Sequence, residues 1–564
     1  MVMLVAPVAV ISAGGDHNGS FSSDAANLTS TDFTGYIPIS SPSDLAKIGN
    51  DPAYPLDGKY YLTNDIYFGN TDTNGDKDGN FDPIGTLDVP FTGTFDGNGH
   101  FISGINISVL MKSYDITVGV GINMGSGVGL FGYVFGAEII NLGLTNGSVS
   151  ATGDVDAMLA ANGGKIDGTD VTVVVGGIVG SAGDITNQSF QLTRITNCYN
   201  TCSVAALAPA GVMTENAFAG GIVGEAQYCQ ITNCYNTGSV TATATSGVFM
   251  CLSIAGGIAG GDSLTQISDC YNTGSVTAIA TITSIQSISS INGVNPNAMA
   301  GGIVGMIGNS KVNGEVINSQ IINCYNIGQI KASSTIIGAS EYINNEASSI
   351  AGGITGVLVS DVASFQINNC YDTGSVTASV VSPFTAYQGA GGIIGGNMSD
   401  LAYFITNCYF LANNTFMTLN GDPVDSLSMD SFVTPVIDGN NSGTPRSGNQ
   451  GTGAYTGQQM TPTLANAKNN NSIYYTGTTT VSSSTVSGWD FNNTWTIVPG
   501  TNNGYPILSA LSGSYSGSSG DSGGSDSGSS GSSGSNIALY AGVVVVIVII
   551  GGCAVFFLHR GGKI

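Results

Sequence analysis

The sequence predicts an all-β fold, a right-handed parallel β-helix, followed by a single transmembrane helix at the C-terminus. Three observations support this prediction. Two short motifs alternate along the middle of the chain, the apolar stretches there span three to six residues between Gly, Asn or Ser-Gly, and an uncharged run of 22 residues lies near the end. Short bounded stretches with alternation are typical of strands, and a repeated unit that cannot bury its own face must stack on its neighbours.

The chain of 564 residues divides into seven predicted segments. In chain order they are a truncated signal peptide (1–13), an N-terminal region with the solenoid cap (14–90), the parallel β-helix (91–412), a C-terminal cap region (413–511), a Ser/Gly-rich linker (512–536), a transmembrane helix (537–558) and a cytoplasmic tail (559–564).

The two ends predict where the protein is located. Residues 1–11 are apolar and are followed by Ser-Ala-Gly, as in a secretion signal, although no positive charge precedes them. Residues 537–558 carry no charge and are long enough to cross a hydrocarbon core of about 30 Å as a helix. Arg560 and Lys563 follow directly, which predicts a cytoplasmic C-terminus. We therefore expect a single-pass protein of the cell membrane, with its ectodomain on the cell surface and the lipid bilayer as a partner of residues 537–558.

The middle of the chain is built from the two alternating motifs. One is best seen as Ile-Thr-Asn-Cys-Tyr-Asn-Thr-Gly-Ser-Val at residues 231–240, and the other as Ala-Gly-Gly-Ile-Val-Gly at residues 219–224. In a parallel stack in register, equivalent side chains lie above one another, so Asn side chains can form hydrogen-bonded ladders. We predict one Asn ladder, interrupted by Asp269, and one core column of Ile. Their members are Asn197, Asn233, Asn323, Asn369 and Asn407, and Ile178, Ile222, Ile258, Ile303, Ile354 and Ile393.

Six of the ten cysteines occupy the same position in successive repeats, with steps of 36, 36, 54, 46 and 38 residues. Neighbouring side chains in such a column point the same way, so a disulfide between them would be strained. We predict that these cysteines are reduced and buried as small apolar side chains. A local bridge among Cys198, Cys202, Cys229 and Cys251 is an alternative that the sequence leaves open.

Together the two motifs resemble the GLUG-motif repeat of bacterial and archaeal surface adhesins, which also occurs in some immunoglobulin-A-cleaving peptidases. The flanks are similar as well, because residues 91–105 resemble the opening coil of these proteins and residues 488–508 resemble their closing segment. The tail is most similar to those of methanogen surface proteins. The resemblance implies a β-helical, adhesin-like cell-surface protein. It does not imply peptidase activity, because those enzymes carry a separate catalytic domain with no counterpart in this sequence.

Composition argues against several classes of function. The chain has 12 Lys and Arg against 37 Asp and Glu, a net charge of −25, so a nucleic-acid partner is not expected. With three His, His-based catalysis has few candidates. Paired carboxylates of a glycosidase could be sought in Asp154 with Asp156 or Asp269 with Asp372. The second pair replaces Asn in the repeats, however, and ladder variation explains it better. We therefore expect a protein that is not an enzyme.

One segment favours a bound cation. Residues 70–82 alternate oxygen-bearing side chains around Gly75, as calcium loops do, although Phe81 stands where such a loop has Glu. The alternative is a solvated, Asx-rich acidic turn. Ca²⁺ is the only cofactor that the sequence suggests, and the expected ligands are Asn70, Asp72, Asn74, Asp76, Asp78 and Asp82.

Variable inserts separate the motifs, and the four main ones lie at residues 204–220, 240–256, 276–301 and 330–352. They are either further strand that lengthens each coil or loops that form a recognition surface. The predicted function is non-enzymatic attachment to cells, a host or extracellular glycans, with a glycan or protein as the ligand. The alternatives are a surface-anchored polysaccharide lyase or glycosidase and a passive component of the cell envelope.

Overall fold

The computed structural model describes residues 32–511 except for internal segments, and four of the predicted segments (1–13, 512–536, 537–558 and 559–564) lie outside it. The internal segments that it leaves out are residues 70, 74–78, 112–126, 162, 165–169, 184–190, 248, 284–293, 309–310, 313–314, 317–318, 338–345, 360–364, 383–384, 398–402, 411–414, 421, 424–453, 457–477, 482–483, 488, 499–501 and 503–504.

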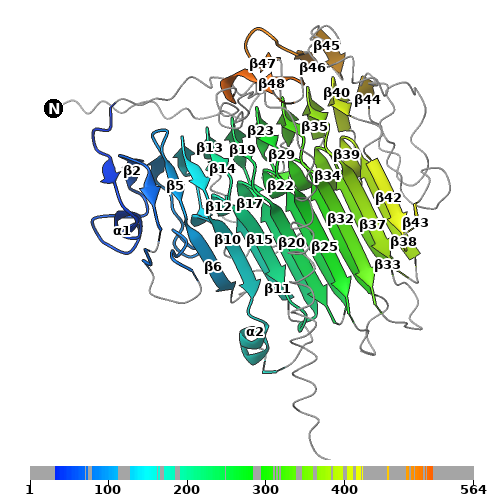
Figure 1. Cartoon of the computed structure of the whole chain (residues 1–564), viewed down its shortest axis with the longest axis horizontal. Coiled ribbons are helices and arrows are strands. Elements are labelled where there is room, and N and C mark those ends of the chain that lie inside the picture. The colour runs from blue at the N-terminus through cyan, green and yellow to red at the C-terminus, as the bar shows by residue number, and fades with distance from the viewer. Residues whose placement is uncertain are drawn as a thin grey trace, which may run out of the picture. The chain divides into compact units, whose positions relative to one another are not determined.

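The chain winds in successive coils, and each regular coil contributes one strand to each of five sheets (Figure 1). We number the sheets 1 to 5 in the order in which the coil from Cys229 to Ser263 passes through them. Adjacent strands in these sheets pair in parallel, except that β43 is antiparallel to β42. The predicted all-β fold with parallel stacking is therefore confirmed.

The strands of sheets 1 and 2 are short. Sheet 1 contains β1 (Ile37–Ile39), β2 (Lys59–Leu62), β4 (Thr94–Asp96), β8 (Glu138–Ile140), β13 (Thr193–Thr196), β18 (Cys229–Thr232), β23 (Gln266–Ser268), β30 (Gln320–Ile322), β35 (Phe365–Asn368), β40 (Tyr403–Thr406) and β44 (Ala454–Thr456). Sheet 2 contains β3 (Ile66–Tyr67), β5 (Phe101–Ser103), β9 (Gly143–Thr145), β14 (Tyr199–Asn200), β19 (Tyr235–Asn236), β24 (Tyr271–Asn272), β31 (Tyr325–Asn326), β36 (Tyr371–Asp372) and β41 (Tyr409–Phe410).

Sheets 3, 4 and 5 contain the longer strands. Sheet 3 contains β6 (Asn106–Met111), β10 (Ser148–Gly153), β15 (Ser203–Ala208), β20 (Val240–Ser246), β25 (Val276–Ile282), β32 (Ile330–Ile336), β37 (Val376–Val381), β42 (Thr415–Leu419) and β43 (Asp422–Pro423). Sheet 4 contains β11 (Asp170–Gly176), β16 (Thr214–Gly220), β21 (Met250–Gly256), β26 (Asn295–Gly301), β33 (Glu346–Gly352) and β38 (Thr385–Gly391). Sheet 5 contains β7 (Phe131–Val134), β12 (Val179–Ala182), β17 (Val223–Gln227), β22 (Ala259–Ser263), β27 (Val304–Gly308), β34 (Thr355–Val359) and β39 (Ile394–Asn397).

Smaller elements complete the described part of the chain. The helices there are α1 (Pro42–Leu45) and α2 (Val155–Ala161), and neither is long and apolar enough to cross a membrane. Three antiparallel pairs stand apart from the five sheets. They are β28 (Lys311–Val312) with β29 (Glu315–Val316), β45 (Thr478–Val481) with β46 (Ser484–Ser487), and β47 (Trp495–Thr496) with β48 (Ile507–Leu508).

The repeats stack in register despite their unequal lengths. Tyr235 and Asn236, for example, pair with Tyr271 and Asn272 of the next coil. Cys270 and Cys324 are 54 residues apart, and the additional residues of this coil lie in two connections between strands, from Ile282 to Asn295 and from Gly308 to Gln320. Parallel pairing also begins at β1, within the segment 14–90 that the sequence assigns to the N-terminal region and cap.

The predicted core column is present. Each of its six isoleucines is at most 1% exposed, and they are Ile178, Ile222, Ile258, Ile303, Ile354 and Ile393. The inward residues of sheet 3 are small, such as Ala242 and Ala244, so sheets 3 and 4 pack closely together. The Ser253 hydroxyl of sheet 4, for instance, donates to the Ala242 carbonyl of sheet 3 at 2.8 Å.

The variable inserts form strands. Residues 204–220 and 240–256 contain β15 with β16 and β20 with β21, and the two longer inserts contain β25 with β26 and β32 with β33. The strand alternative is therefore correct for most of the described insert residues, and short connections such as residues 209–213 join the strands. Residues 248, 284–293 and 338–345 of the inserts lie outside the described part.

Candidate functional site

The predicted Asn ladder is present, and we call it the outer column. Its seven residues from coil to coil share a left-handed backbone with φ between 53° and 55°, and they are Asn141, Asn197, Asn233, Asp269, Asn323, Asn369 and Asn407. Asn and Asp are the residues other than Gly that adopt this conformation most readily. Each amide that pairs donates toward the N-terminal neighbour, as Asn369 Nδ2 does to Asn323 Oδ1 at 3.2 Å. Asn is therefore required here for its backbone as well as for its amide.

A second Asn ladder, which the sequence does not predict, lies three residues further along the motif. This inner column is fully buried and consists of Asn200, Asn236, Asn272, Asn326 and Asp372. Asn236 Nδ2 donates to Asn272 Oδ1 at 2.9 Å and to the Gly238 carbonyl at 2.8 Å. Backbone partners of this kind fix which amide atom is the donor. The inner column consequently donates toward the C-terminus, opposite to the outer column.

The inner column explains why the Ala-Gly-Gly-Ile-Val-Gly motif has glycine at the second position of its Gly-Gly pair. A Cβ on Gly221 would lie 2.1 Å from the Gly257 carbonyl oxygen and 2.5 Å from Asn236 Cγ. Real Cβ atoms do not approach so closely, and the same clash recurs at Gly257 against Asn272 and at Gly302. The two motifs are thus in contact across each coil, because the second glycine makes room for the buried asparagine.

Both columns end on an aspartate, whose Oδ1 accepts from the last amide of the column. The outer column begins at Asp96, whose Oδ1 accepts from Asn141 Nδ2 at 3.0 Å. The inner column ends at Asp372, whose Oδ1 accepts from Asn326 Nδ2 at 2.8 Å and from the Gly374 amide at 3.1 Å. Burial raises the pKa of the Asp372 carboxyl to about 8. Asp372 therefore replaces Asn at a ladder position, as predicted, and is the last residue of the inner column.

The cysteine column lies beside the outer column and is reduced, as predicted. Cys234 Sγ donates weakly to the Thr232 and Ile195 carbonyls at 3.3 and 3.6 Å. Burial raises the pKa of these thiols well above the ordinary range, so they are poor nucleophiles. The open alternative of a local bridge is wrong, because all nine described cysteines are free and buried. They are Cys198, Cys202, Cys229, Cys234, Cys251, Cys270, Cys324, Cys370 and Cys408.

Tyrosines of sheet 2 stack in a further column, the tyrosine column, which runs from Tyr199 to Tyr371. Adjacent ring centroids lie 4.8–5.0 Å apart and the planes differ by 2–7°. The segment around Trp495 covers the C-terminal part of this column, where Tyr371 Oη donates to the Pro506 carbonyl at 2.6 Å. Trp489 Nε1 also donates to the Asn407 carbonyl at 2.8 Å. The predicted closing segment thus packs on the column, whereas Tyr199 and the next ring are half-buried.

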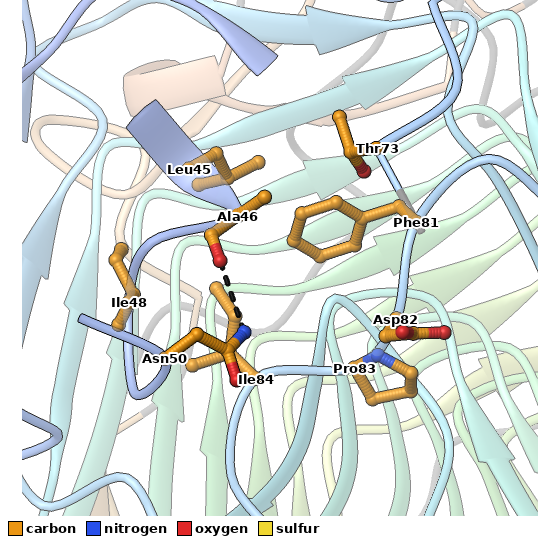
Figure 2. A pocket seen from close by; sticks show the side chains of 9 residues that line it. All are labelled: Leu45, Ala46, Ile48, Asn50, Thr73, Phe81, Asp82, Pro83 and Ile84. Carbon is orange, nitrogen blue, oxygen red and sulfur yellow. Dashed lines mark hydrogen bonds between the residues drawn. The ribbon is translucent and has the colours of Figure 1, made fainter. Parts of the chain in front are cut away.

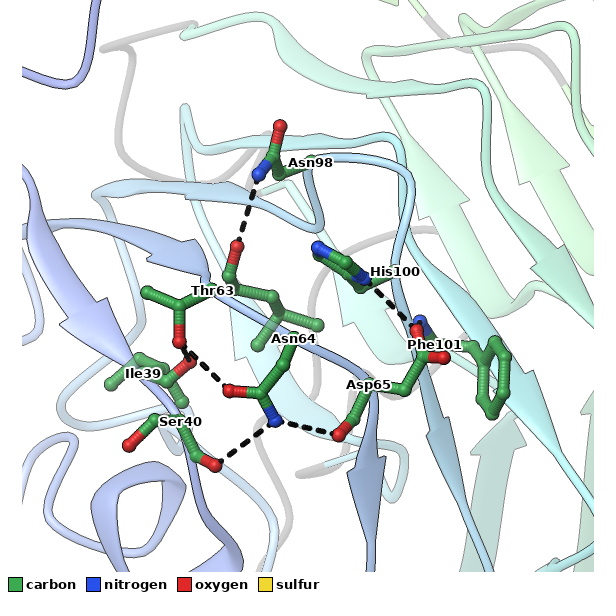
Figure 3. A network of polar contacts seen from close by, with 9 residues as sticks. Ile39, Ser40, Thr63, Asn64, Asp65, Asn98, His100 and Phe101 are labelled. Atoms are coloured by element: carbon green, nitrogen blue, oxygen red, sulfur yellow. Dashed lines mark hydrogen bonds and ion pairs between the residues drawn. The ribbon is translucent and has the colours of Figure 1, made fainter.

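Sheet 2 carries a His–Asp pair at its N-terminal end (Figure 3). His100 Nδ1 lies 3.0 Å from Asp65 Oδ1, and both side chains are about one-third exposed, at 32% and 34%. The Phe101 amide donates to the same carboxylate oxygen at 3.3 Å. The pair holds the imidazole at the surface beside aromatic residues, of which Tyr67 is 62% exposed.

The structure describes two of the six predicted calcium ligands, Asp72 and Asp82. The other four, Asn70, Asn74, Asp76 and Asp78, lie outside the described residues, so the calcium loop stays a prediction. Among the described residues, no group of three or more His, Cys, Asp or Glu is placed to hold a metal ion.

A small cavity lies between residues 45–50, at the end of α1 and just after it, and Thr73 with residues 81–84. Its volume is about 50 Å³, which is enough for a water molecule or an ion but not for an organic ligand. Figure 2 shows the Phe81 ring turned toward the residues of α1. The lining residues are Leu45, Ala46, Ile48, Asn50, Thr73, Phe81, Asp82, Pro83 and Ile84.

The carboxylate pairs considered for a glycosidase have other contacts. Asp154 accepts a hydrogen bond from the Ala157 amide at 2.9 Å, at the start of α2. Asp269 and Asp372 belong to different columns; Asp269 accepts from Asn323 of the following coil and Asp372 from Asn326 of the preceding coil. These carboxylates therefore stabilise local structure.

A solvent-contacting surface lies on the outer side of sheet 3, which we call the hydroxyl face. Along β20, β25 and β32, buried residues alternate with solvent-contacting Thr, Ser, Ile and Lys. Lys331 is the only charged outward residue on β6, β10, β15, β20, β25, β32 and β37. The signal for this face is the period-two sequence Val-Thr-Ala-Thr-Ala-Thr-Ser at residues 240–246, which predicts a strand with one polar side.

Rows of side chains run along the hydroxyl face from coil to coil. Thr245, Thr281 and Thr335 pair in register and form one row of three hydroxyls. The next row consists of Thr243, Ile279 and Ser333, and the row after it of Thr241, Thr277 and Lys331. The spacing along a row is that of neighbouring strands, about 4.8 Å, and that between rows is about 6.7 Å.

Comparison with known proteins agrees with this architecture. Residues 219–241 match the GLUG motif, and they span both elements of the repeat, from the glycine pair to the strand after the inner asparagine. The chain carries GLUG-motif repeats. In structural terms, one GLUG repeat places a member in the outer, inner, cysteine and tyrosine columns at once.

Two further similarities were found. Halomucin of Haloquadratum walsbyi is 33% identical over 175 residues, which amount to 28% of this chain and 2% of halomucin. This chain thus spans a small fraction of that relative. The crystal structure of a "putative immunoglobulin A1 protease" from Bacteroides ovatus aligns with 85% of this chain and 93% of its own, at 19% identity and a TM-score of 0.39.

Proposed function

We propose that this GLUG-repeat chain is a non-enzymatic cell-surface protein that attaches to an extracellular partner through the outer faces of its β-helix. The observation that carries the proposal is the hydroxyl face, an exposed surface on which neutral polar side chains repeat from coil to coil. A repeating surface contacts an extended partner at several coils at once, so individually weak contacts add up.

Location at the surface is supported by sequence. The similarity to halomucin supports a cell-surface protein, and the apolar residues 537–558 with their basic flank favour a single membrane anchor. The net charge of −25 favours solubility of an exposed protein and disfavours anionic partners.

The fate of the titratable groups supports attachment rather than catalysis. The buried carboxylates Asp269 and Asp372 are hydrogen-bonded within the columns, and the described cysteines are buried thiols with raised pKa values. These groups contribute to the packing and hydrogen bonding between coils. The exposed faces, in contrast, present hydroxyls and amides, which recognise a partner without changing its covalent bonds.

Cell attachment tests the proposal directly. Non-adherent cells that display the full chain should bind to immobilised extracellular polymers and to neighbouring cells. Cells that display only residues 512–564 are the matched control and should not bind. If the two cell types attach equally, attachment is not the function of the β-helix.

The same assay separates the alternatives. Release of new reducing ends or unsaturated sugars from a polymer would establish the rival function, a polysaccharide-active enzyme. A deletion strain that loses envelope integrity but attaches normally would favour a passive structural role.

Calcium binding by residues 70–82 is a separate proposal, supported by the spacing of oxygen ligands in that segment. Titration calorimetry of the full chain with CaCl₂ should show uptake that the D72N/D82N variant lacks. Equal heats for the two proteins would contradict it.

A further inference from the structure

We propose that the hydroxyl face binds a neutral polysaccharide, whose chain contacts the rows of Thr and Ser hydroxyls on successive coils. This inference rests on the proposed attachment function and names the surface and the ligand class. The face is formed by the outward residues of β10, β15, β20, β25, β32 and β37.

Charge is the first argument for a neutral ligand. The outward positions on these strands hold one charged residue, Lys331, in a chain with a net charge of −25. An anionic polymer would be repelled by the chain as a whole and would find a single cation on this face. A cationic partner would find no carboxylate on these outward positions.

Periodicity is the second argument. Outward side chains recur at about 4.8 Å along the rows and at about 6.7 Å across them, and most of these positions on β20, β25 and β32 carry hydroxyls. Thr245, Thr281 and Thr335 occupy consecutive positions in one row. A partner that engages several members of such a lattice must itself repeat at a comparable interval. Polysaccharides repeat their hydroxyls along the chain, whereas the surfaces of most folded proteins do not repeat.

The side-chain chemistry is the third argument. A Thr hydroxyl both donates and accepts a hydrogen bond, as sugar hydroxyls do. The Thr methyl groups and the interspersed apolar residues offer contacts for the C–H groups of sugar rings. Of these apolar residues, Leu207 is 39% exposed and Val381 is 46% exposed. They are separated by polar positions, so they do not form the continuous apolar patch typical of a stable protein–protein interface.

Each hydroxyl contributes little net binding free energy, so the ligand must span several coils. Binding should therefore increase with polymer length, and short oligosaccharides should compete poorly for the face. The wild-type full chain should be retained on at least one of three neutral insoluble polymers, namely cellulose, chitin and cross-linked dextran.

Removing hydroxyls without changing shape tests the face itself. In the variant T241V/T243V/T277V/T281V, four outward Thr on β20 and β25 become Val, which favours strands. Retention should fall about tenfold or more, which corresponds to about 1.4 kcal/mol. A second variant, T243K, adds a positive charge to the face. Lys331, in a neighbouring row, shows that the face accommodates a lysine side chain.

The matched control is T201V/T237V/T273V, which removes three solvent-contacting hydroxyls adjacent to sheet 2 and leaves the hydroxyl face intact. It should be retained like the wild type. Equal retention of the control and of the face variants would overturn the inference. So would a dimer in sedimentation experiments that the four-Val variant abolishes, because the face would then bind a second copy.

Failure of this inference can be distinguished from failure of the proposed function. If cells displaying the full chain attach, but no neutral polymer retains the protein, attachment stands and the polysaccharide assignment falls. If those cells do not attach either, both fall together.

Discussion

The outer and inner columns place asparagine three residues apart in the same motif, and yet the two asparagines have different roles. Asn233 adopts φ +54° at a corner of the coil, whereas Asn236 is 0% exposed and binds the coils on both sides. The outer position therefore selects asparagine for its backbone conformation as well as its amide, and the inner position selects it for its amide alone. A residue type that recurs in a repeat does not by itself tell which property is required.

The columns also run in opposite directions. Outer amides donate toward the N-terminus and inner amides toward the C-terminus, and each column has a carboxylate at its accepting end, Asp96 in one and Asp372 in the other. The Oδ1 atom of each aspartate accepts from the last amide of its column, so that amide is not left without an acceptor. The comparison predicts that substitutions in the inner column cost more stability than those in the outer column.

The largest effect is expected for N236A. The substitution removes the acceptor of Asn200 Nδ2 and the donors to Asn272 Oδ1 and the Gly238 carbonyl. Leaving such buried groups unpaired should lower the free energy of unfolding by about 3 kcal/mol. Denaturant unfolding of the full chain measures this, with N233A as the matched control. A cost for N236A no larger than that for N233A would contradict the distinction between the columns.

The next effect is on pH dependence and arises from Asp372. Its pKa is raised to about 8 in the folded state from an ordinary value of 3.8, so the folded state binds the proton more tightly than the unfolded state. The resulting stability is fully present below about pH 4 and is lost as the pH rises through about 8. Buried Glu215 and Glu225, with pKa values raised to about 7, act in the same direction.

We therefore expect the protein to unfold at a higher denaturant concentration at pH 5 than at pH 8.5. In D372N the decline between pH 7 and 8.5 should be smaller, because asparagine can keep the bond from Asn326 and does not ionise. Urea titrations of both proteins across this range test the prediction. Stability that increases with pH in the wild type would rule it out.

The sequence predicted the features that depend on residue identity within the repeat. Parallel stacking, the isoleucine column, the outer asparagines and the reduced cysteines all follow from the same residue returning at the same motif position. It did not predict the contact between Gly221 and Asn236, because these residues belong to different motifs and meet only after the coil has turned. For a related reason, the place of Asp372 at the end of its ladder was not predicted. Only the donor direction of the column shows that a carboxylate fits its last position.

A smaller effect is expected at the outer column, where N233A and N233G can be compared. Alanine at φ +54° is disfavoured by about 1 to 2 kcal/mol, whereas glycine adopts this conformation without steric cost. N233A should therefore be less stable than N233G. The ranking of the two variants in denaturant unfolding is the test, and it would fail if alanine were the better tolerated residue. Because the inner Asn236 is selected for its amide, N236G should show no such advantage over N236A.

The smallest effect concerns Asp269, the one carboxylate within the outer column between Asn233 and Asn323. Its Oδ1 accepts from Asn323 Nδ2 at 3.0 Å, and burial raises its pKa to about 6. Above that pH the side chain is a buried anion with no donor for the preceding coil. D269N keeps the acceptor, removes the charge and supplies an amide that can donate toward Asn233, as the other outer asparagines do to their neighbours.

D269N should accordingly stabilise the protein by about 1 kcal/mol at pH 8. At pH 5 the gain should be smaller, because protonated Asp269 is already neutral and its hydroxyl can serve as the missing donor. Paired unfolding curves of D269N and the wild type at the two pH values measure the difference. An equal gain at both values would mean that the charge of Asp269 does not matter. A loss at both would mean that the column needs an interruption at this coil, and in that case the outer column would not be a continuous ladder even in principle.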